Sequence, residues 1–210
     1  ELTAGIDSNA SEMDKFATIY ERMTNSITYD HDCIRRTDKL EARRKKEWDD
    51  KDYTAASRTT GEIKQERREA AGLYGGLVNG KAICAGYAMI LHEALQYVGI
   101  KSKYLEGYPL DGTHGHAWNQ VKIDGKWYNV DVTWDDNDGV EEGNHCYFMS
   151  SSEAFYKTHT PNDVYADENL IFNSKEYSGS GKNYYYKMNK LYATDEEDAK
   201  EILAREIADY

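Results

Sequence analysis

Two runs of β-forming residues joined by Asp124-Gly125 constrain the fold of this chain more than any other stretch. The first run is His116–Ile123 and the second is Lys126–Trp134. Both runs alternate and are rich in Val, Ile, Trp and Tyr, and Asp-Gly is the strongest short-range signal of a two-residue hairpin turn. The sequence therefore predicts an antiparallel hairpin whose register is set by its turn.

This register brings His116 and Asp131 close together. Counting outward from the turn, Trp118 faces Asp131 and His116 faces Thr133, all on one face of the hairpin. The other face carries the side chains expected in the core: Val121, Ile123, Tyr128, Val130, Val132 and Trp134. His116 and Asp131 are then diagonal neighbours about 7–8 Å apart, within reach of a hydrogen bond between imidazole and carboxylate.

A cysteine, Cys84, lies where an apolar helix is predicted to begin. Apolar residues recur from Cys84 to Val98 at steps of three and four, and Gly99 ends the pattern. In the first turn of a helix, unpaired N–H groups and the helix dipole favour a thiolate, which is the nucleophilic form of cysteine. The alternative is that Cys84 is a small buried hydrophobic residue, as unpaired cysteines usually are.

Cys84, His116 and Asp131 together match the needs of nucleophilic catalysis. A cysteine nucleophile requires a base, and the base requires a group that orients it and selects its tautomer. The N–H of Cys84 is then a natural donor to an oxyanion. The alternatives are an incidental polar pair on a partly exposed sheet face and a zinc site, for which no paired-ligand spacing is present.

The composition narrows the classes of function. A net charge of -12 argues against binding to nucleic acid or to anionic membranes, and no apolar run is long enough to span a bilayer. The chain begins at Glu1 without a signal peptide, and we interpret it as a mature or trimmed form. Three cysteines leave at least one unpaired, and a disulfide between Cys33 and Cys146 stays open.

The remaining elements are predicted from weaker patterns. Helices are expected to start at Ser11 and to cover 32–46, 152–158 and the stretch opened by the capping box 194–197. Strands are expected over 101–107 and 145–150, and a small hairpin over 183–193. A long charged connection is expected over 47–71, with one weak helix near 62–71 at most, and a glycine-rich segment over 74–80 leads into the helix of Cys84. The expected division is N-terminal helices and charged connection at 1–72, a core at 73–160 and an extension at 161–210.

Three motifs in this order resemble the transglutaminase-like superfamily. They are Gly80–Ala88 around the cysteine, His116-Ala117-Trp118-Asn119, and Trp127–Asp135. The resemblance covers roughly 73–150 and is closest to bacterial members, which are commonly secreted or on the cell surface. It implies an α+β papain-like core, in which a helix bearing Cys84 packs on an antiparallel sheet bearing His116 and Asp131, with N-terminal helices and a C-terminal hairpin and helix.

The family resemblance also implies an activity. It implies thiol-dependent acyl transfer on peptide or side-chain amides of a peptide or protein substrate, with no cofactor and no metal, in an extracellular or cell-surface protein. A cysteine peptidase or amidase is favoured over a protein-crosslinking transglutaminase, because no second extended segment for an amine donor is evident. A non-catalytic module that binds cell-wall or protein ligands is the alternative from another class.

Three neighbouring residues complete the predicted site. His114 is a rival to His116 as the base, and both the family match and the diagonal to Asp131 favour His116. Trp118 is expected either to shield the His116–Asp131 bond from water or simply to pack in the sheet. Tyr74 is a candidate second oxyanion donor, although an ordinary core or loop position is favoured for it.

Overall fold

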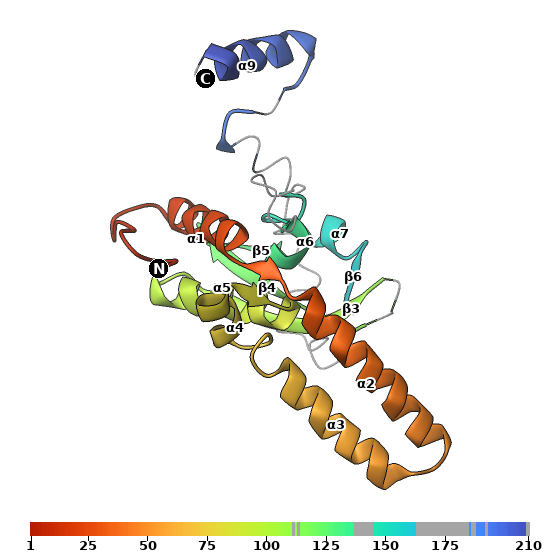
Figure 1. Ribbon diagram of the computed structural model, residues 1–210. Helices are drawn as coiled ribbons and strands as arrows, with labels where there is room; N and C mark the ends of the chain where they lie inside the picture. The colour runs from red at the N-terminus through yellow and green to blue at the C-terminus, as the bar shows by residue number, and fades with distance from the viewer. Residues whose placement is uncertain are drawn as a thin grey trace.

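The fold is α+β, as the sequence predicts (Figure 1). The computed structural model describes residues 1–110, 112, 114–136, 145–162, 185, 188–191 and 193–208. The helices are α1 (Glu12–Ser26), α2 (His31–Asp49), α3 (Tyr53–Arg67), α4 (Leu73–Asn79), α5 (Cys84–Tyr97), α6 (Val132–Asp135), α7 (Ser152–Phe155) and α9 (Glu196–Ala208). The strands are β1 (Thr28–Tyr29), β2 (Lys81–Ala82), β3 (Ser102–Pro109), β4 (His116–Ile123), β5 (Lys126–Val130) and β6 (His159–Pro161).

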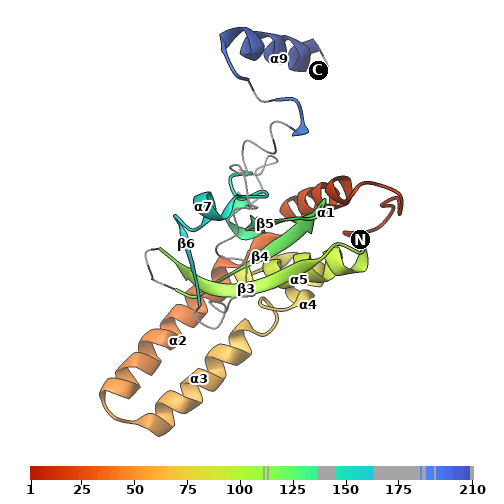
Figure 2. The same ribbon diagram turned by 180° about the vertical axis from the view of Figure 1, so that it is seen from behind.

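A four-stranded antiparallel sheet in the order β5-β4-β3-β6 forms the centre of the molecule (Figure 2). The predicted hairpin is confirmed near its turn, because Ile123 pairs with Lys126 and Val121 pairs with Tyr128. Asp124 and Gly125 both have positive φ, as a tight two-residue turn requires. The predicted register is therefore correct from the turn as far as Val130.

Both faces of the sheet are covered. Helices α1 and α5 bury one face in the main core, which includes the predicted side chains Val121, Ile123, Tyr128 and Val130 of the sheet and Val132 of α6. On the opposite face, Leu105 and Trp118 pack with Phe155 of α7 in a second cluster. The face that carries His116 and Trp118 is thus buried rather than partly exposed.

The predicted extension of the second strand to Trp134 is wrong. Strand β5 ends at Val130, and Asp131 is instead the N-cap of α6, accepting a hydrogen bond from the N–H of Trp134. Asp is among the best N-cap residues and poor in strands, so the capping bond replaces the expected pairs with Asp131 and Thr133. The ring of Trp134 consequently lies against His116 rather than in the main core.

The charged stretch 47–71 is not a loop, which corrects a second prediction. Asp52 caps the 15-residue helix α3, and α2 and α3 form a long antiparallel pair that extends away from the sheet (Figure 1). Arg43 and Glu62 are ion-paired across this pair, and Thr59 and Ile63 are buried within it. The charged side chains that suggested a long surface loop therefore lie on the solvated faces of two paired helices.

One predicted strand differs from the structure. Residues 145–150 form turns with a single bridge between Asn129 and Ser150, because His145 and Met149 have positive φ.

The predicted hairpin over 183–193 lies largely outside the described residues. Of the residues described there, Tyr185 and Met188 have helical backbone, and the N–H of Asn189 donates to the Tyr185 carbonyl.

Buried glycines allow the backbone around the start of α5 to pack closely. A Cβ on Gly86 would stand 2.3 Å from the carbonyl oxygen of Ala70, and one on Gly76 would stand 2.3 Å from the side chain of Ile90. Strands β1 and β2 pair in parallel just before α5, and the N–H of Ile83 donates to Ala70. These contacts fix the backbone on which Cys84 begins its helix.

Helix α9 is capped by Asp195, one residue later than the predicted threonine, Thr194, and buries none of its residues.

Across the described parts of the chain, no helix combines the length and the apolar character needed to cross a membrane.

Candidate functional site

Cys84 is the first residue of α5, as predicted. Its N-cap, Ile83, has extended backbone and makes no side-chain capping bond, so no side chain satisfies the first N–H groups of the helix. Cys84 is half-buried, and none of the three cysteines forms a disulfide. The thiol is therefore accessible at a helix N-terminus, where a negative charge is stabilised.

The structure brings His116 to both Cys84 and Asp131. Nε2 of His116 lies 2.6 Å from Oδ2 of Asp131, and both side chains are buried. Cys84 and His116 line the same cavity, and a hydrogen bond with Cys84 is among the causes that raise the pKa of His116. Because Nε2 is engaged by Asp131, Nδ1 is the nitrogen left for the thiol. The structure thus brings the three predicted residues together at one site.

The electrostatics of this chain favour a charged imidazole. Burial by itself lowers the pKa of His116, but the charge of Asp131 and the hydrogen bonds to Asp131 and Cys84 outweigh it and raise the pKa to about 10. Burial likewise raises the pKa of Asp131, but the charge of His116 and hydrogen bonds from His116 and His159 bring it well below its usual range. Asp131 is therefore ionised and holds His116 in its protonated form.

His159 is a site residue that the sequence analysis missed. It begins β6, and its Nε2 lies 3.0 Å from Oδ2 of Asp131, the same oxygen that contacts His116. Its sequence signal is slight, a histidine in Thr158-His159-Thr160-Pro161 with no spacing that links it to the other motifs. Strand pairing with β3 brings it to the site, and that pairing is not readable from local sequence.

Among the described residues, one group of side chains lies close enough together to hold a metal ion: His116, Asp131 and His159. Their nitrogen and oxygen atoms lie within 4.8 Å of one another. The predicted zinc alternative used Cys84 in place of His159. The two direct contacts to Asp131, at 2.6 Å and 3.0 Å, are ordinary hydrogen-bond lengths. A zinc ion about 2.0–2.2 Å from each ligand would require these contacts to open, so hydrogen bonding accounts for the grouping as it stands.

Aromatic rings enclose the histidine–aspartate cluster. The ring of Trp134 stacks on His116 with 5.1 Å between ring centroids, and that of Trp118 stacks at 6.1 Å. Trp118 is also edge-on to His159 at 5.2 Å. Trp118 thus packs in the sheet with its ring against both histidines of the cluster, and its role as a shield of the His116–Asp131 bond from water stays a prediction.

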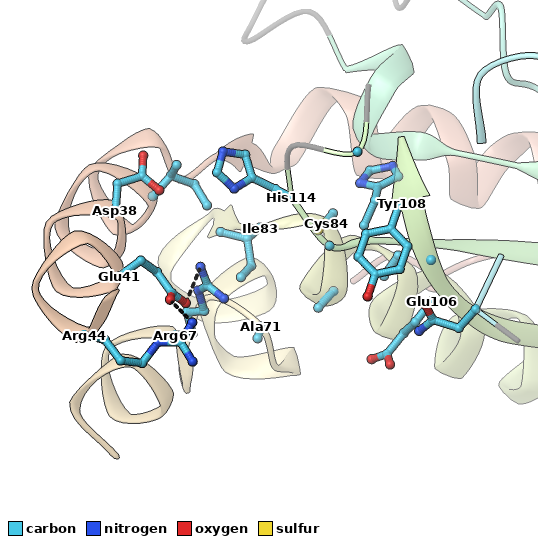
Figure 3. Close-up of a pocket in the computed structure, with 18 of the residues that line it drawn as sticks. Asp38, Glu41, Arg44, Arg67, Ala71, Ile83, Cys84, Glu106, Tyr108 and His114 are labelled. Atoms are coloured by element: carbon cyan, nitrogen blue, oxygen red, sulfur yellow. Dashed lines mark ion pairs between the residues drawn. The ribbon is translucent and has the colours of Figure 1, made fainter. Parts of the chain in front are cut away.

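Cys84 opens onto a cavity of about 1230 Å³ between the α2–α3 pair and strands β3 and β4 (Figure 3). One wall is a stripe of α2 that includes Asp38 and Glu41, and the other includes Tyr108 of β3. The residues that line the cavity include Tyr29, Asp38, Arg67, Glu106, Tyr108 and His114. The cavity is large enough for a side chain and the backbone on either side of it.

His114 and Tyr29 line this cavity, whereas Tyr74 does not. His114 is exposed in the loop before β4, and the histidines that contact Asp131 are His116 and His159. Tyr74, the candidate oxyanion donor, is 56% exposed on α4. Tyr29 of β1 lines the same cavity as Cys84, and burial first and the charge of Cys84 second raise the pKa of its hydroxyl.

Comparison with known proteins identifies the family. The chain belongs to the transglutaminase-like superfamily, whose family model matches residues 1–132. This match includes Cys84, His116 and Asp131, and it covers the α2–α3 pair that no predicted motif explained.

Individual relatives are distant. Kyphoscoliosis peptidase from Homo sapiens is 27% identical over 100 residues, which are 40% of this chain and 15% of that protein. The Mus musculus protein of that name is 26% identical over 102 residues, with the same shares covered. A solved structure described as a TGase superposes with a TM-score of 0.42 and 21% identity, over 60% of this chain and 27% of its own. The matched segment thus spans about 15% of the length of the two named relatives.

Proposed function

We propose that this protein is a thiol-dependent acyl-transfer enzyme that acts on peptide or side-chain amides, with Cys84 as nucleophile, His116 as base and Asp131 as orienting residue. The observation that carries the proposal is the hydrogen bond between His116 and the buried Asp131 beside Cys84, which begins α5 and lines the same cavity as His116. Membership of the transglutaminase-like superfamily supports it.

The geometry supports a two-step reaction. The Cys84 thiolate attacks the amide carbonyl carbon, and a C–S bond forms while the carbonyl electrons move to oxygen. The N–H of Cys84, at the start of α5, stabilises this oxyanion. When the intermediate collapses, the C–N bond breaks and protonated His116 transfers its proton to the leaving amine. Water or a second amine then attacks the thioester and loses a proton to His116, and the thiolate is released.

The cavity supports a polypeptide substrate. The cavity has residues of α2 on one side of Cys84 and residues of β3 on the other, so the thiol lies between two walls (Figure 3). Asp38, Glu106 and Arg67 present both signs of charge along the cavity. A chain with mixed polar side chains fits this lining better than a small apolar ligand does.

We propose hydrolysis as the main outcome, with transamidation as the alternative. Both reactions share the thioester and differ in what attacks it. Support for hydrolysis comes from the relatives, which are named peptidases, and from the sequence, in which no second extended segment for an amine donor is evident.

Two measurements test this function. A peptide vinyl sulfone should modify Cys84 covalently, and mass spectrometry of the digested protein should locate the adduct there, with none in His116→Ala. Incubation with casein and a fluorescent primary amine should release new peptides without incorporating the amine. Amine incorporation in place of cleavage would identify a transamidase, and no adduct at Cys84 would remove the enzyme proposal.

A further inference from the structure

His159 is a buried histidine in contact with Asp131 of the proposed site. It is 1% exposed, and its ring is stacked on Phe155 with 3.9 Å between centroids and packed 4.4 Å from Trp134. Its Nε2 contacts Oδ2 of Asp131 at 3.0 Å. A buried polar ring of this kind requires partners for both nitrogens, and the second lies 2.9 Å from the hydroxyl of Thr158.

The contact with Asp131 determines that Nε2 of His159 carries a hydrogen. Because Asp131 is ionised, Nε2 must donate this hydrogen to Oδ2. Nδ1 faces the hydroxyl of Thr158, which itself donates to the Phe155 carbonyl, and this carbonyl lies 3.3 Å from Nδ1. The ring is held at both nitrogens and on its faces by aromatic side chains, so it cannot rotate without breaking several contacts.

Asp131 in turn depends on donors from more than one side. Its Oδ1 accepts from the N–H of Trp134 at 3.2 Å, and its Oδ2 accepts from His159 and His116. Rotation of a carboxylate about its last bond is broad and nearly two-fold, so one donor does not fix its plane. The capping bond and the bond from His159 hold the two oxygens separately, which leaves Oδ2 directed at His116.

The approach of β6 that delivers His159 depends on Gly107. A Cβ at this position would stand 2.1 Å from the carbonyl oxygen of Thr160 and 2.6 Å from the ring of Trp118. Any side chain there would push β6 away from β3, and Pro109 pairs with His159 in that same ladder. Gly107 and His159 therefore act on the site through one structural element.

We propose that His159 is a positioning residue, which fixes the plane of the Asp131 carboxylate so that it orients His116 toward Cys84. This proposal rests on the thiol chemistry proposed above. It assigns β6 a role in the reaction even though none of its residues contacts the thiol in the contacts described.

The test compares three replacements of His159 by the labelling of Cys84 with iodoacetamide from pH 5 to pH 9. Gln places its amide N–H near Nε2 and should keep the rate at pH 6 within about threefold of the wild type. His159→Leu removes the donor, and His159→Asn has a shorter amide that ends near the position of Nδ1. Both should lower the labelling rate at pH 6 about 10–100-fold, the usual range for the loss of an outer hydrogen-bond partner. Peptide mass spectrometry separates Cys84 from Cys33 and Cys146, and circular dichroism checks folding.

His145→Gln is the matched control, because His145 is also buried and contacts a carboxylate, Glu21, at 2.7 Å. It should leave the labelling profile unchanged. Gly107→Ala should reproduce the loss without altering any polar side chain. If the Leu variant does not fold, the comparison of Gln with Asn decides alone.

The outcomes separate two failures. A wild type whose Cys84 labels at pH 6 no faster than a free thiol would overturn the proposed function. A wild type that labels fast, together with folded Leu and Asn variants that label equally fast, would overturn the role of His159 and leave the function intact.

Discussion

Replacing Asp131 with Asn perturbs every contact of the site through one atom. Asn caps helices as well as Asp does, so its amide oxygen can keep the bond from the N–H of Trp134. The amide NH₂ then stands where Oδ2 was, facing the ring nitrogens of His116 and His159. At His159 a donor then faces a donor, and a neutral His116 can accept from the amide only in the tautomer whose N–H points toward Cys84. Flipping the amide would restore an acceptor for His159 only by losing the cap.

The magnitude follows from the contacts and from the pKa of His116. An unpaired buried donor costs about 1–3 kcal/mol, so we expect Asp131→Asn to lower the free energy of unfolding by about 2–4 kcal/mol. A pKa near 10 in place of 6.5 corresponds to about 5 kcal/mol of preference for the imidazolium, shared by Asp131 and Cys84. Without the Asp131 charge, burial dominates and His116 is neutral at pH 7. Acyl transfer should then fall roughly 10²–10⁴-fold.

The sign of the pH effect follows from the raised pKa of His116. Folding raises this pKa, so the stabilisation is fully present below about pH 6.5 and is lost as the pH rises toward 10. The free energy of unfolding of the wild type should therefore decline between pH 6.5 and pH 10, by at most about 5 kcal/mol. Asp131→Asn should remove most of this decline.

Urea unfolding at pH 6, 8 and 10 measures how the free energy of unfolding declines with pH. Iodoacetamide labelling of Cys84 at the same pH values measures the ion pair between the Cys84 thiolate and protonated His116. Asp52→Asn is the control, because Asp52 is the N-cap of α3 in the α2–α3 pair and carries the same chemical change. We expect it to leave both profiles as in the wild type. An Asp131→Asn protein that keeps the wild-type slope and low-pH labelling would refute the role of Asp131 in holding the charge of His116.

Three further predictions concern the nucleophile, the base and the packing around α5. Cys84→Ala should abolish turnover and leave the circular dichroism spectrum unchanged; near-normal turnover would remove the enzyme proposal. His116→Ala should return the labelling of Cys84 to the profile of a free thiol, with its pKa of about 8.5, whereas His114→Ala should hardly change it; the reverse result would make His114 the base. Gly86→Ala should lower the free energy of unfolding by about 1–3 kcal/mol through overpacking, and Gly61→Ala, where a Cβ meets nothing within 4 Å, should not.

Much of the site was predictable because its signals are local. A two-residue turn sets the register of a hairpin, so the pairs from Ile123 and Lys126 out to Asn119 and Val130 follow from counting residues out from Asp124-Gly125, and Asp131 lies one residue beyond the last pair. The start of α5 at Cys84 follows from helical periodicity in the same way.

The errors arose where a local signal competes with a second one. Asp131 was placed in a strand because its neighbours are β-formers, yet its side chain caps α6 and ends the strand there. The same competition hid α3, since charge suggested a loop while the cap at Asp52 and the pairing with α2 stabilise a helix. Propensity is a weak prior when capping and packing act against it.

The sequence by itself determined the hairpin register, the helix that begins at Cys84 and the resemblance that placed the chain in its superfamily. Only the tertiary structure decided that the face of His116 is buried, that a cavity lies between α2 and β3, and that His159 reaches Asp131. The reason is the separation of partners along the chain. Pairing of β6 with β3 joins residues about fifty positions apart and depends on the missing side chain of Gly107, which no periodic pattern records.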